Sequence, residues 1–155
     1  MSGSHLLIGA LLLGLTSSCS PEAASVYVDA ERAALTQADQ SYTQFATGND
    51  SENIIGLYAT DAIIYPPHSA AVNGLDGVRG FVDEFTSIPD LSLNFQPWVI
   101  EVSKSGDMGY TINMVDITSP DSLGNPVTIA HRDVHTWGKD DNGSWKVMVD
   151  IWNEE

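Results

Sequence analysis

The sequence is poor in positive charge. Only 6 of its 155 residues are Lys or Arg, against 21 Asp or Glu, which gives a formal net charge of −15. The basic residues are scattered along the chain: Arg32, Arg79, Lys104, Arg132, Lys139 and Lys146. Phosphate backbones and anionic lipid headgroups repel such a surface. We therefore expect no nucleic-acid partner, and no membrane contact through the surface of the folded domain.

Cysteine and long hydrophobic runs are also scarce. Cys19 is the only cysteine, so the chain has no internal disulfide and its stability does not depend on oxidation. The apolar and glycine run at 6–15 has 10 residues, whereas a bilayer-spanning helix needs about 20. This length is typical of the core of a signal peptide. The hydrophobic content of 43% indicates a packed domain rather than a disordered acidic tail.

The N-terminal run ends in Thr16-Ser17-Ser18-Cys19, which resembles the lipobox of bacterial lipoproteins. In that family the cysteine is acylated and becomes the first residue of the mature chain. The resemblance implies a signal peptide at 1–19, a tether at 20–25 and a domain at 26–155, exported as a periplasmic or cell-envelope lipoprotein. Its lipid would be the only membrane attachment. Two features leave an alternative, an ordinary secretory signal in which Cys19 has no role. Residues 1–5 contain no Lys or Arg, and the leucine that a lipobox usually has three positions before the cysteine stands one position earlier, at Leu15.

Hydrophobic periodicity predicts three helices followed by strands. Val28, Leu35, Ala38, Tyr42 and Phe45 share one helical face that ends near Gly48-Asn49. A short helix follows over 54–58, then a strand over 61–65 and a third helix over 77–85. From residue 91 the period changes to two, which predicts strands over 92–103, 108–118, 127–139 and 144–153. The expected fold class is α+β, with three N-terminal helices packed on a curved, mainly antiparallel sheet.

Three blocks resemble the NTF2-like superfamily, in its SnoaL-like and DUF4440 branch. They are 57–62 (LYATDA), Gly74 with the helix 77–85, and the C-terminal pair 136–147 and 150–153. The resemblance covers roughly residues 28–153. It implies a cone, in which a bent sheet wraps around the helices and leaves an apolar pocket. It does not specify the function, because this fold hosts isomerases, cyclases, dehydratases, binding modules and dimerisation domains.

Ketosteroid isomerase, a member of that superfamily, uses a tyrosine and a protonated aspartic acid as hydrogen-bond donors and a second aspartate as base. By resemblance, Tyr42 matches the tyrosine and Asp133 the protonated acid. The base would fall at Pro66, which cannot accept a proton. His68 is a replacement candidate because an imidazole titrates near neutral pH, although it also reads as a solvated loop residue. Tyr42 and Asp133 have an alternative role as a structural pair that holds the helix to the sheet.

Strand parity supplies further candidates. The even positions of 108–118 form an apolar row with one acid, Asp116, and the even positions of 92–103 include Trp98. If these rows line the cone, burial favours the neutral form of Asp116 and suits it to proton transfer. The alternative places Asp116 at the solvated mouth. On the same grounds we expect ligand contacts from aromatic and imidazole side chains: Tyr65, Trp98, Tyr110, Trp152 and His68.

His131, Asp133, His135 and Trp137 share one face of the predicted strand 127–139. Residues four apart on a strand lie about 13 Å apart, so His131 and His135 cannot both bind one ion without a bulge. With no second cluster to complete the ligand set, we expect neither a metal nor another cofactor.

Two functions remain open from the sequence. The first is an exported, non-catalytic module that binds a small apolar ligand or forms a homodimer through the outer face of the sheet. The second is a cofactor-free acid–base enzyme, such as an isomerase, cyclase or hydratase. Its candidate catalytic residues are Tyr42, Asp116, His131 and Asp133.

Overall fold

The computed structural model describes residues 21–155, so the expected signal peptide and Cys19 lie outside the described part of the chain. The helices are α1 (Pro21–Thr47), α2 (Ser51–Gly56) and α3 (Gly74–Thr86). The strands are β1 (Tyr58–Tyr65), β2 (Val72–Asn73), β3 (Ser92–Val102), β4 (Met108–Pro120), β5 (Pro126–Lys139) and β6 (Trp145–Glu154). Residues 21–25, expected to form a tether, are helical. Within residues 21–155 no helix is long and apolar enough to cross a membrane.

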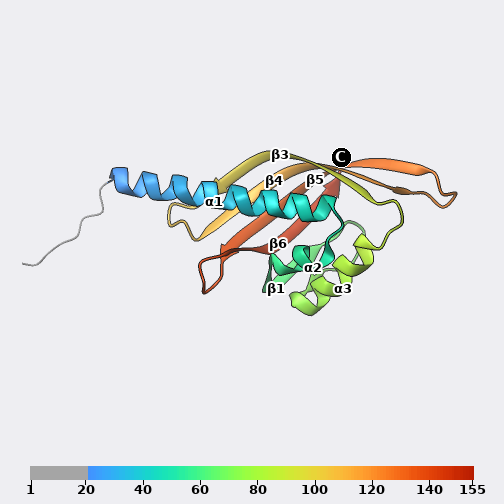
Figure 1. The fold of residues 1–155 in the computed structure, drawn as a ribbon, viewed down its shortest axis with the longest axis horizontal. Helices are drawn as coiled ribbons and strands as arrows, with labels where there is room; N and C mark the ends of the chain where they lie inside the picture. The colour runs from blue at the N-terminus through green and yellow to red at the C-terminus, as the bar shows by residue number, and fades with distance from the viewer. Residues whose placement is uncertain (1–20) are drawn as a thin grey trace, which may run out of the picture.

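The strands form one mixed sheet in the order β2-β1-β6-β5-β4-β3. Every neighbouring pair is antiparallel except β1 and β6, which are parallel. Register shifts interrupt β1, β3 and β6, and such irregularities bend a strand and increase its twist. Figure 1 shows α1 lying lengthwise along the sheet, while α2 and α3 pack at the β1 end. The expected α+β class, with three helices on a curved and mainly antiparallel sheet, is confirmed.

Local signals explain the helix boundaries. Asn49 and Gly48 end α1, and Asn49 adopts a left-handed backbone with φ of 51°. The Asp50 side chain then accepts a hydrogen bond from the Asn53 backbone N–H, which caps α2. Gly74 begins α3 with φ of 72°, a conformation that favours glycine.

The core lies between the inner face of the sheet and the helices. Leu35, Ile64, Trp137 and Val147 are fully buried and come from α1, β1, β5 and β6. Helix α1 approaches β4 closely at Gly109, where a Cβ atom would lie 2.5 Å from Leu35 Cδ2 and 2.7 Å from the Glu101 carbonyl oxygen. The absence of a side chain at Gly109 therefore permits the contact between helix and sheet.

Replacing Gly109 with alanine tests this close approach. We expect Gly109→Ala to lower the free energy of unfolding by about 1–3 kcal/mol, because the backbone oxygen cannot move away without disturbing the β3–β4 pairing. The matched control is Gly80→Ala in α3, where an added Cβ meets nothing within 4 Å. It should raise the stability by about 0.5–1 kcal/mol. Urea denaturation measures both changes, and equal stability of Gly109→Ala and the wild type would contradict the packing argument.

Candidate functional site

A cavity lies between the inner face of the sheet and the three helices. Its volume is about 60 Å³, and about 580 Å³ of atom-free space lies within the cavity and its open mouth. A water molecule needs about 10–15 Å³ on the smaller measure, so the cavity has room for several waters or a small organic molecule. Most of its wall is apolar, formed by Ala46, Ile54, Phe81, Val82, Phe85, Leu93, Phe95, Val115, Ile117 and Trp152.

Aromatic rings form the α3 side of this wall. The Phe81 ring stacks on Phe85 with centroids 6.0 Å apart and lies 5.9 Å from the ring of Trp152. On the opposite side, the Phe95 ring meets Tyr42 edge-on at 6.2 Å. A flat apolar ligand would therefore find ring surfaces on two sides of the cavity.

A chain of hydroxyl groups forms one polar part of the cavity. Tyr58 donates its O–H to Asp150 Oδ2 at 2.5 Å, and the Tyr42 and Tyr58 hydroxyls are 3.2 Å apart. Because the single Tyr58 hydrogen is used on Asp150, Tyr42 must donate to Tyr58. The three residues come from α1, β1 and β6, so these hydrogen bonds connect the first helix to both parallel strands.

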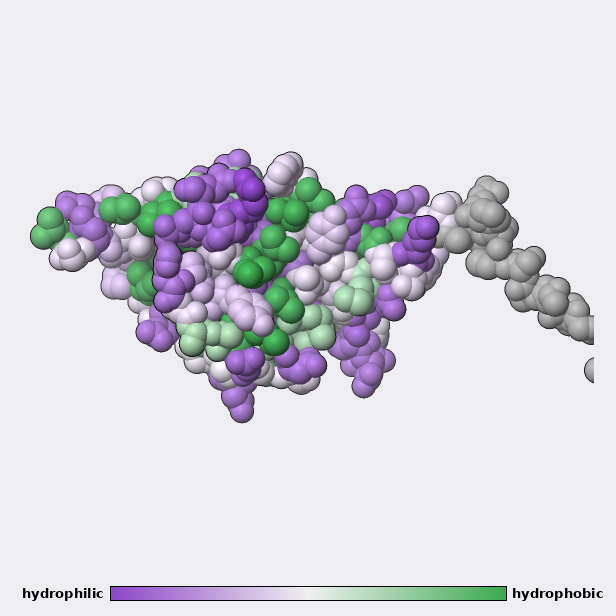
Figure 2. All heavy atoms as spheres, turned by 180° about the vertical axis from the view of Figure 1, so that it is seen from behind, coloured by the Kyte–Doolittle hydropathy of each residue, from purple (hydrophilic) through white to green (hydrophobic). Residues whose placement is uncertain are grey.

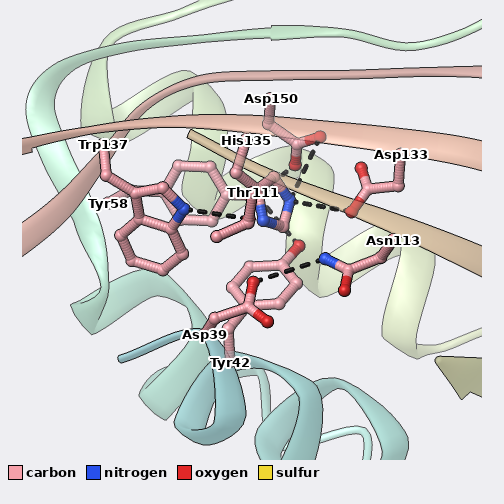
Figure 3. A network of polar contacts seen from close by, with 9 residues as sticks. All are labelled: Asp39, Tyr42, Tyr58, Thr111, Asn113, Asp133, His135, Trp137 and Asp150. Atoms are coloured by element: carbon pink, nitrogen blue, oxygen red, sulfur yellow. Dashed lines mark hydrogen bonds and ion pairs between the residues drawn. The ribbon is translucent and has the colours of Figure 1, made fainter. Parts of the chain in front are cut away.

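His135 lies between two carboxylates behind the polar end of the cavity (Figure 3). Its Nε2 atom is 3.3 Å from Asp133 Oδ2 and 3.6 Å from Asp150 Oδ1. The His135 side chain is only 1% exposed, and its ring packs against Tyr42 with centroids 4.3 Å apart. Cross-strand pairing explains the contact with Asp150, because His135 on β5 is directly opposite Asp150 on β6.

The charges in this cluster shift each other's protonation. Burial raises the pKa of Asp133 to about 7; the charge of His135 opposes this shift, whereas that of Asp150 adds to it. Burial by itself lowers the pKa of His135, but the charges of Asp133 and Asp150 outweigh it and raise the pKa to about 9. Burial and the charge of Asp150 raise the pKa of Tyr42 and Tyr58 well above their usual range, so both remain hydrogen-bond donors.

Two further polar pairs complete the buried network. Asn113 Nδ2 donates to Asp39 Oδ1 at 3.3 Å, and Trp137 Nε1 donates to Thr111 Oγ1 at 3.1 Å. Several buried atoms have no hydrogen-bond partner among the described residues, including Asp39 Oδ2, Asn113 Oδ1, Asp133 Oδ2, Asp150 Oδ1 and both His135 nitrogens. Such atoms are rare in folded proteins and mark a place where a ligand, ion or water completes the network.

Four of the side chains predicted from the sequence line the cavity. Tyr42, His131, Asp133 and Trp152 all contribute to its wall. His131 Nδ1 donates to the Ile129 carbonyl at 2.9 Å. His131, Asp133, His135 and Trp137 share the buried face of β5, as the parity of that strand predicts.

The face predicted for β4 was wrong, and Asp116 lies outside the cavity. The buried row consists of Thr111, Asn113 and Val115, and the even row faces outward, with Tyr110 41% exposed. Asp116 accepts a hydrogen bond from Asn94 at the outer side of the sheet. The inner row is polar because Thr111 and Asn113 form the hydrogen bonds described above, so its composition resembles that of a solvated face.

Trp98, Tyr65 and His68 also lie away from the cavity. The register shift between Pro97 and Val99 turns Trp98 outward, where it is 62% exposed and lies under the Arg132 guanidinium at 5.5 Å. Tyr65 is 43% exposed, since it follows the buried Ile64 on an alternating strand. The His68 side chain is 83% exposed, in the loop after β1 and 3.7 Å from Glu154.

Sequence reasoning missed part of the buried network. Tyr58 stands in the block that resembles the superfamily, and Asp150 stands in the C-terminal block, but neither was assigned a role. His135 was considered only along its own strand. The signal that unites them is the β5–β6 pairing, which places His135 opposite Asp150. Asp39 and Asn113 carry no distinguishing sequence pattern.

Comparison with known proteins gives structural matches alone. No family model and no curated protein matches the sequence. A ketosteroid isomerase-like protein from Erwinia carotovora atroseptica SCRI1043 aligns with a TM-score of 0.72 at 18% identity, over 80% of this chain and 95% of that one. An NTF2-like protein with a cystatin-like fold from Novosphingobium aromaticivorans DSM gives 0.68 at 15% identity, over 88% and 90%.

A third similar structure is a hub domain. The CaMKII hub of S. rosetta aligns with a TM-score of 0.64 at 15% identity, over 79% of this chain and 95% of that one. The similarity of these structures establishes the fold. The sequence identities are too low to transfer a function from them. The structure and these neighbours together show that the chain has the NTF2-like cone fold.

Proposed function

We propose that the domain binds a small, largely apolar organic molecule in the cavity, with one polar group directed at Asp133 and Asp150. The observation that carries this proposal is the contrast within one cavity. Its wall is mostly apolar, whereas two buried carboxylate oxygens at its polar end lack hydrogen-bond partners among the described residues. Ligand pockets commonly combine apolar walls with a few convergent polar groups.

The polar atoms of the cavity favour a hydroxyl group on the ligand. Asp133 Oδ2 and Asp150 Oδ1 are acceptors when ionised, and a hydroxyl can donate to either. A hydroxyl can also accept a hydrogen bond if Asp133 carries a proton. A ligand without a polar group would leave these buried oxygens unsatisfied.

Phenol and toluene test this preference because they differ mainly in one polar group. We expect phenol to bind at least about tenfold more tightly than toluene, a difference of about 1.4 kcal/mol. Ala46→Leu adds carbon atoms to the cavity wall and should weaken phenol binding at least about tenfold. Ala34→Leu, at an exposed position of the same helix, should leave the affinity unchanged. Ligand-observed NMR titration measures all four affinities.

Equal binding of phenol by wild type and Ala46→Leu would place the ligand elsewhere and refute the proposal.

A second candidate function is cofactor-free acid–base catalysis, favoured because Asp133 and the Tyr42–Tyr58–Asp150 chain face the same cavity. Turnover of a ketone, enol or epoxide that Asp133→Asn abolishes would assign this second function. No turnover across such a panel, combined with phenol binding, would leave a binding module.

We further propose that the domain forms a homodimer through the outer face of the sheet. An apolar row crosses five strands in register, pairing Tyr65, Ile151, Val134, Ile112 and Val99 in turn. Exposed large side chains border this row: Trp98, Met108 and Tyr110. Figure 2 shows a band of hydrophobic residues on the face opposite to that of Figure 1. Contiguous exposed apolar surface of this kind marks interaction sites, and the similarity to a hub domain supports self-association.

Ile151→Glu tests this interface at the middle of the row. Ile151 is 44% exposed, and a buried, unpaired carboxylate in a dimer interface should convert the dimer to a monomer. Leu123→Glu is the matched control, since Leu123 is 84% exposed in the turn between β4 and β5. Light scattering coupled to size-exclusion chromatography gives the mass. A wild-type monomer, or a dimer that persists in Ile151→Glu, would contradict the proposed interface.

The sequence of residues 1–20 supports a proposal about location. We propose that the protein is exported and attached to the cell envelope through a lipid on Cys19, with the remaining domain in an extracytoplasmic compartment such as the periplasm. The support is the short apolar run at 6–15 and its ending in small residues before the only cysteine.

Protein purified from its own host should therefore have a mature N-terminus at Cys19 and the additional mass of acyl chains. Mass spectrometry measures both properties. Cys19→Ala should prevent lipid attachment and move the protein from the membrane fraction to the soluble fraction. A wild-type protein cleaved near residue 19 without added mass would instead indicate an ordinary secretory signal.

A further inference from the structure

Three side chains on adjacent strands direct one ligand atom each toward a common point. Asp133 and His135 on β5 and Asp150 on β6 each offer one ligand atom, and these atoms all lie within 4.8 Å of one another. The closest approaches of His135 Nε2 are to Asp133 Oδ2 and Asp150 Oδ1. The side chains of Asp133, His135 and Asp150 are 8%, 1% and 5% exposed. Figure 3 shows the imidazole between the two carboxylates.

None of the three atoms has a hydrogen-bond partner in the described part of the chain. His135 Nε2 is 3.3 Å from Asp133 Oδ2 and 3.6 Å from Asp150 Oδ1, so it is close enough to both carboxylates for an ion pair without forming a well-made hydrogen bond to either. Each unsatisfied buried polar atom costs about 1–3 kcal/mol. A cation between the three atoms would satisfy all of them and offset the two negative charges.

The two separations from the imidazole nitrogen suit a metal ion. Ligands about 2.1 Å from an ion in tetrahedral geometry are about 3.4 Å apart. The imidazole nitrogen is 3.3 Å from one carboxylate oxygen and 3.6 Å from the other. One nitrogen and two oxygens form a donor set suited to a divalent transition metal such as Zn²⁺ or Mn²⁺.

The surroundings of the cluster support the same assignment. Tyr58 donates to Asp150 Oδ2, which orients the carboxylate and leaves Oδ1 directed at the cluster. Hydrogen bonds to the outer atoms of metal ligands commonly fix their orientation. Asp133 and Asp150 also line the cavity, so an ion between them would have a coordination position open toward it.

We propose that Asp133, His135 and Asp150 bind one divalent transition-metal ion, with an open coordination position facing the cavity. This inference goes beyond the proposed binding of an organic ligand and does not require it. It differs from the expectation of no metal because that expectation considered ligands along β5 alone. The third ligand comes from β6 through the pairing of His135 with Asp150.

Titration of the chelator-treated full chain with Zn²⁺ tests the site by calorimetry, and Co²⁺ absorption spectra report its geometry. We expect about one equivalent of either ion to bind the wild type, with intense d–d bands for Co²⁺ in a tetrahedral site. His135→Gln should weaken Zn²⁺ binding at least about 100-fold. Tyr58→Phe removes the hydrogen bond to Asp150 and the acceptor of the Tyr42 hydroxyl but none of the three ligand atoms, and should weaken binding about tenfold. Zn²⁺ should raise the unfolding temperature of the wild type but not that of His135→Gln.

His68→Gln is the matched control, because the His68 side chain is exposed in the loop after β1 and lies outside the cluster. It should bind Zn²⁺ with the affinity of the wild type. All variants keep His5 and Cys19, so any contribution of those residues is common to every titration. If His135→Gln does not fold, Tyr58→Phe and Asp150→Asn provide the comparison. The absence of stoichiometric binding by the wild type, or unchanged affinity in the folded cluster variants, would overturn the proposal.

No organic ligand is present in these titrations. If the wild type binds Zn²⁺ but not phenol, only the proposed function is refuted. If the wild type binds phenol but not Zn²⁺, only the proposed metal site is refuted.

Discussion

The burial of His135 between two carboxylates is the constraint on which the inner face of this domain depends. Removing ionisable groups from water costs several kcal/mol for each ion, and only close pairing recovers that cost. The protein pairs His135 with Asp133 and Asp150, and adds a tyrosine hydroxyl on the far oxygen of Asp150. Because these partners come from β1, β5 and β6, their electrostatic requirements fix the register of three strands.

The same constraint explains why the inner face of β4 is polar. Thr111 and Asn113 are fully or almost fully buried, yet each bonds a polar group of another element. Asn113 reaches Asp39 on α1, and Thr111 receives the indole N–H of Trp137. A core built only from apolar side chains would leave Asp39 and Trp137 without partners, which costs more than the hydrogen-bonded arrangement.

The bounds of the last four strands could be predicted from the sequence because their signals are local. Earlier bounds were less accurate: α1 includes residues expected to form a tether, α2 ends before residue 58, and β2 was not predicted. Periodicity and turn residues give the strand 92–103, and the structure has β3 at Ser92–Val102. The inner row of β4 could not be predicted from composition, since its polar residues resemble a solvated face and its outer residues resemble a core. The contact between His135 and Asp150 depends on pairing between separate strands. Parity along one strand contains no information about that pairing.

Under our proposals, the space between Asp133, His135 and Asp150 has two alternative occupants. In the metal-free protein the two carboxylates hold a proton on His135 and raise its pKa to about 9. An ion bound to Nε2 must displace that proton, because the same lone pair cannot serve both. Either occupant supplies positive charge to the carboxylates, so the inner face remains balanced in both states. The two states would differ at the cavity: with the ion bound, an open coordination position would face the ligand in place of carboxylate oxygens that are ion-paired with the imidazolium. The occupant of this one buried position therefore determines which chemical group the cavity can recognise.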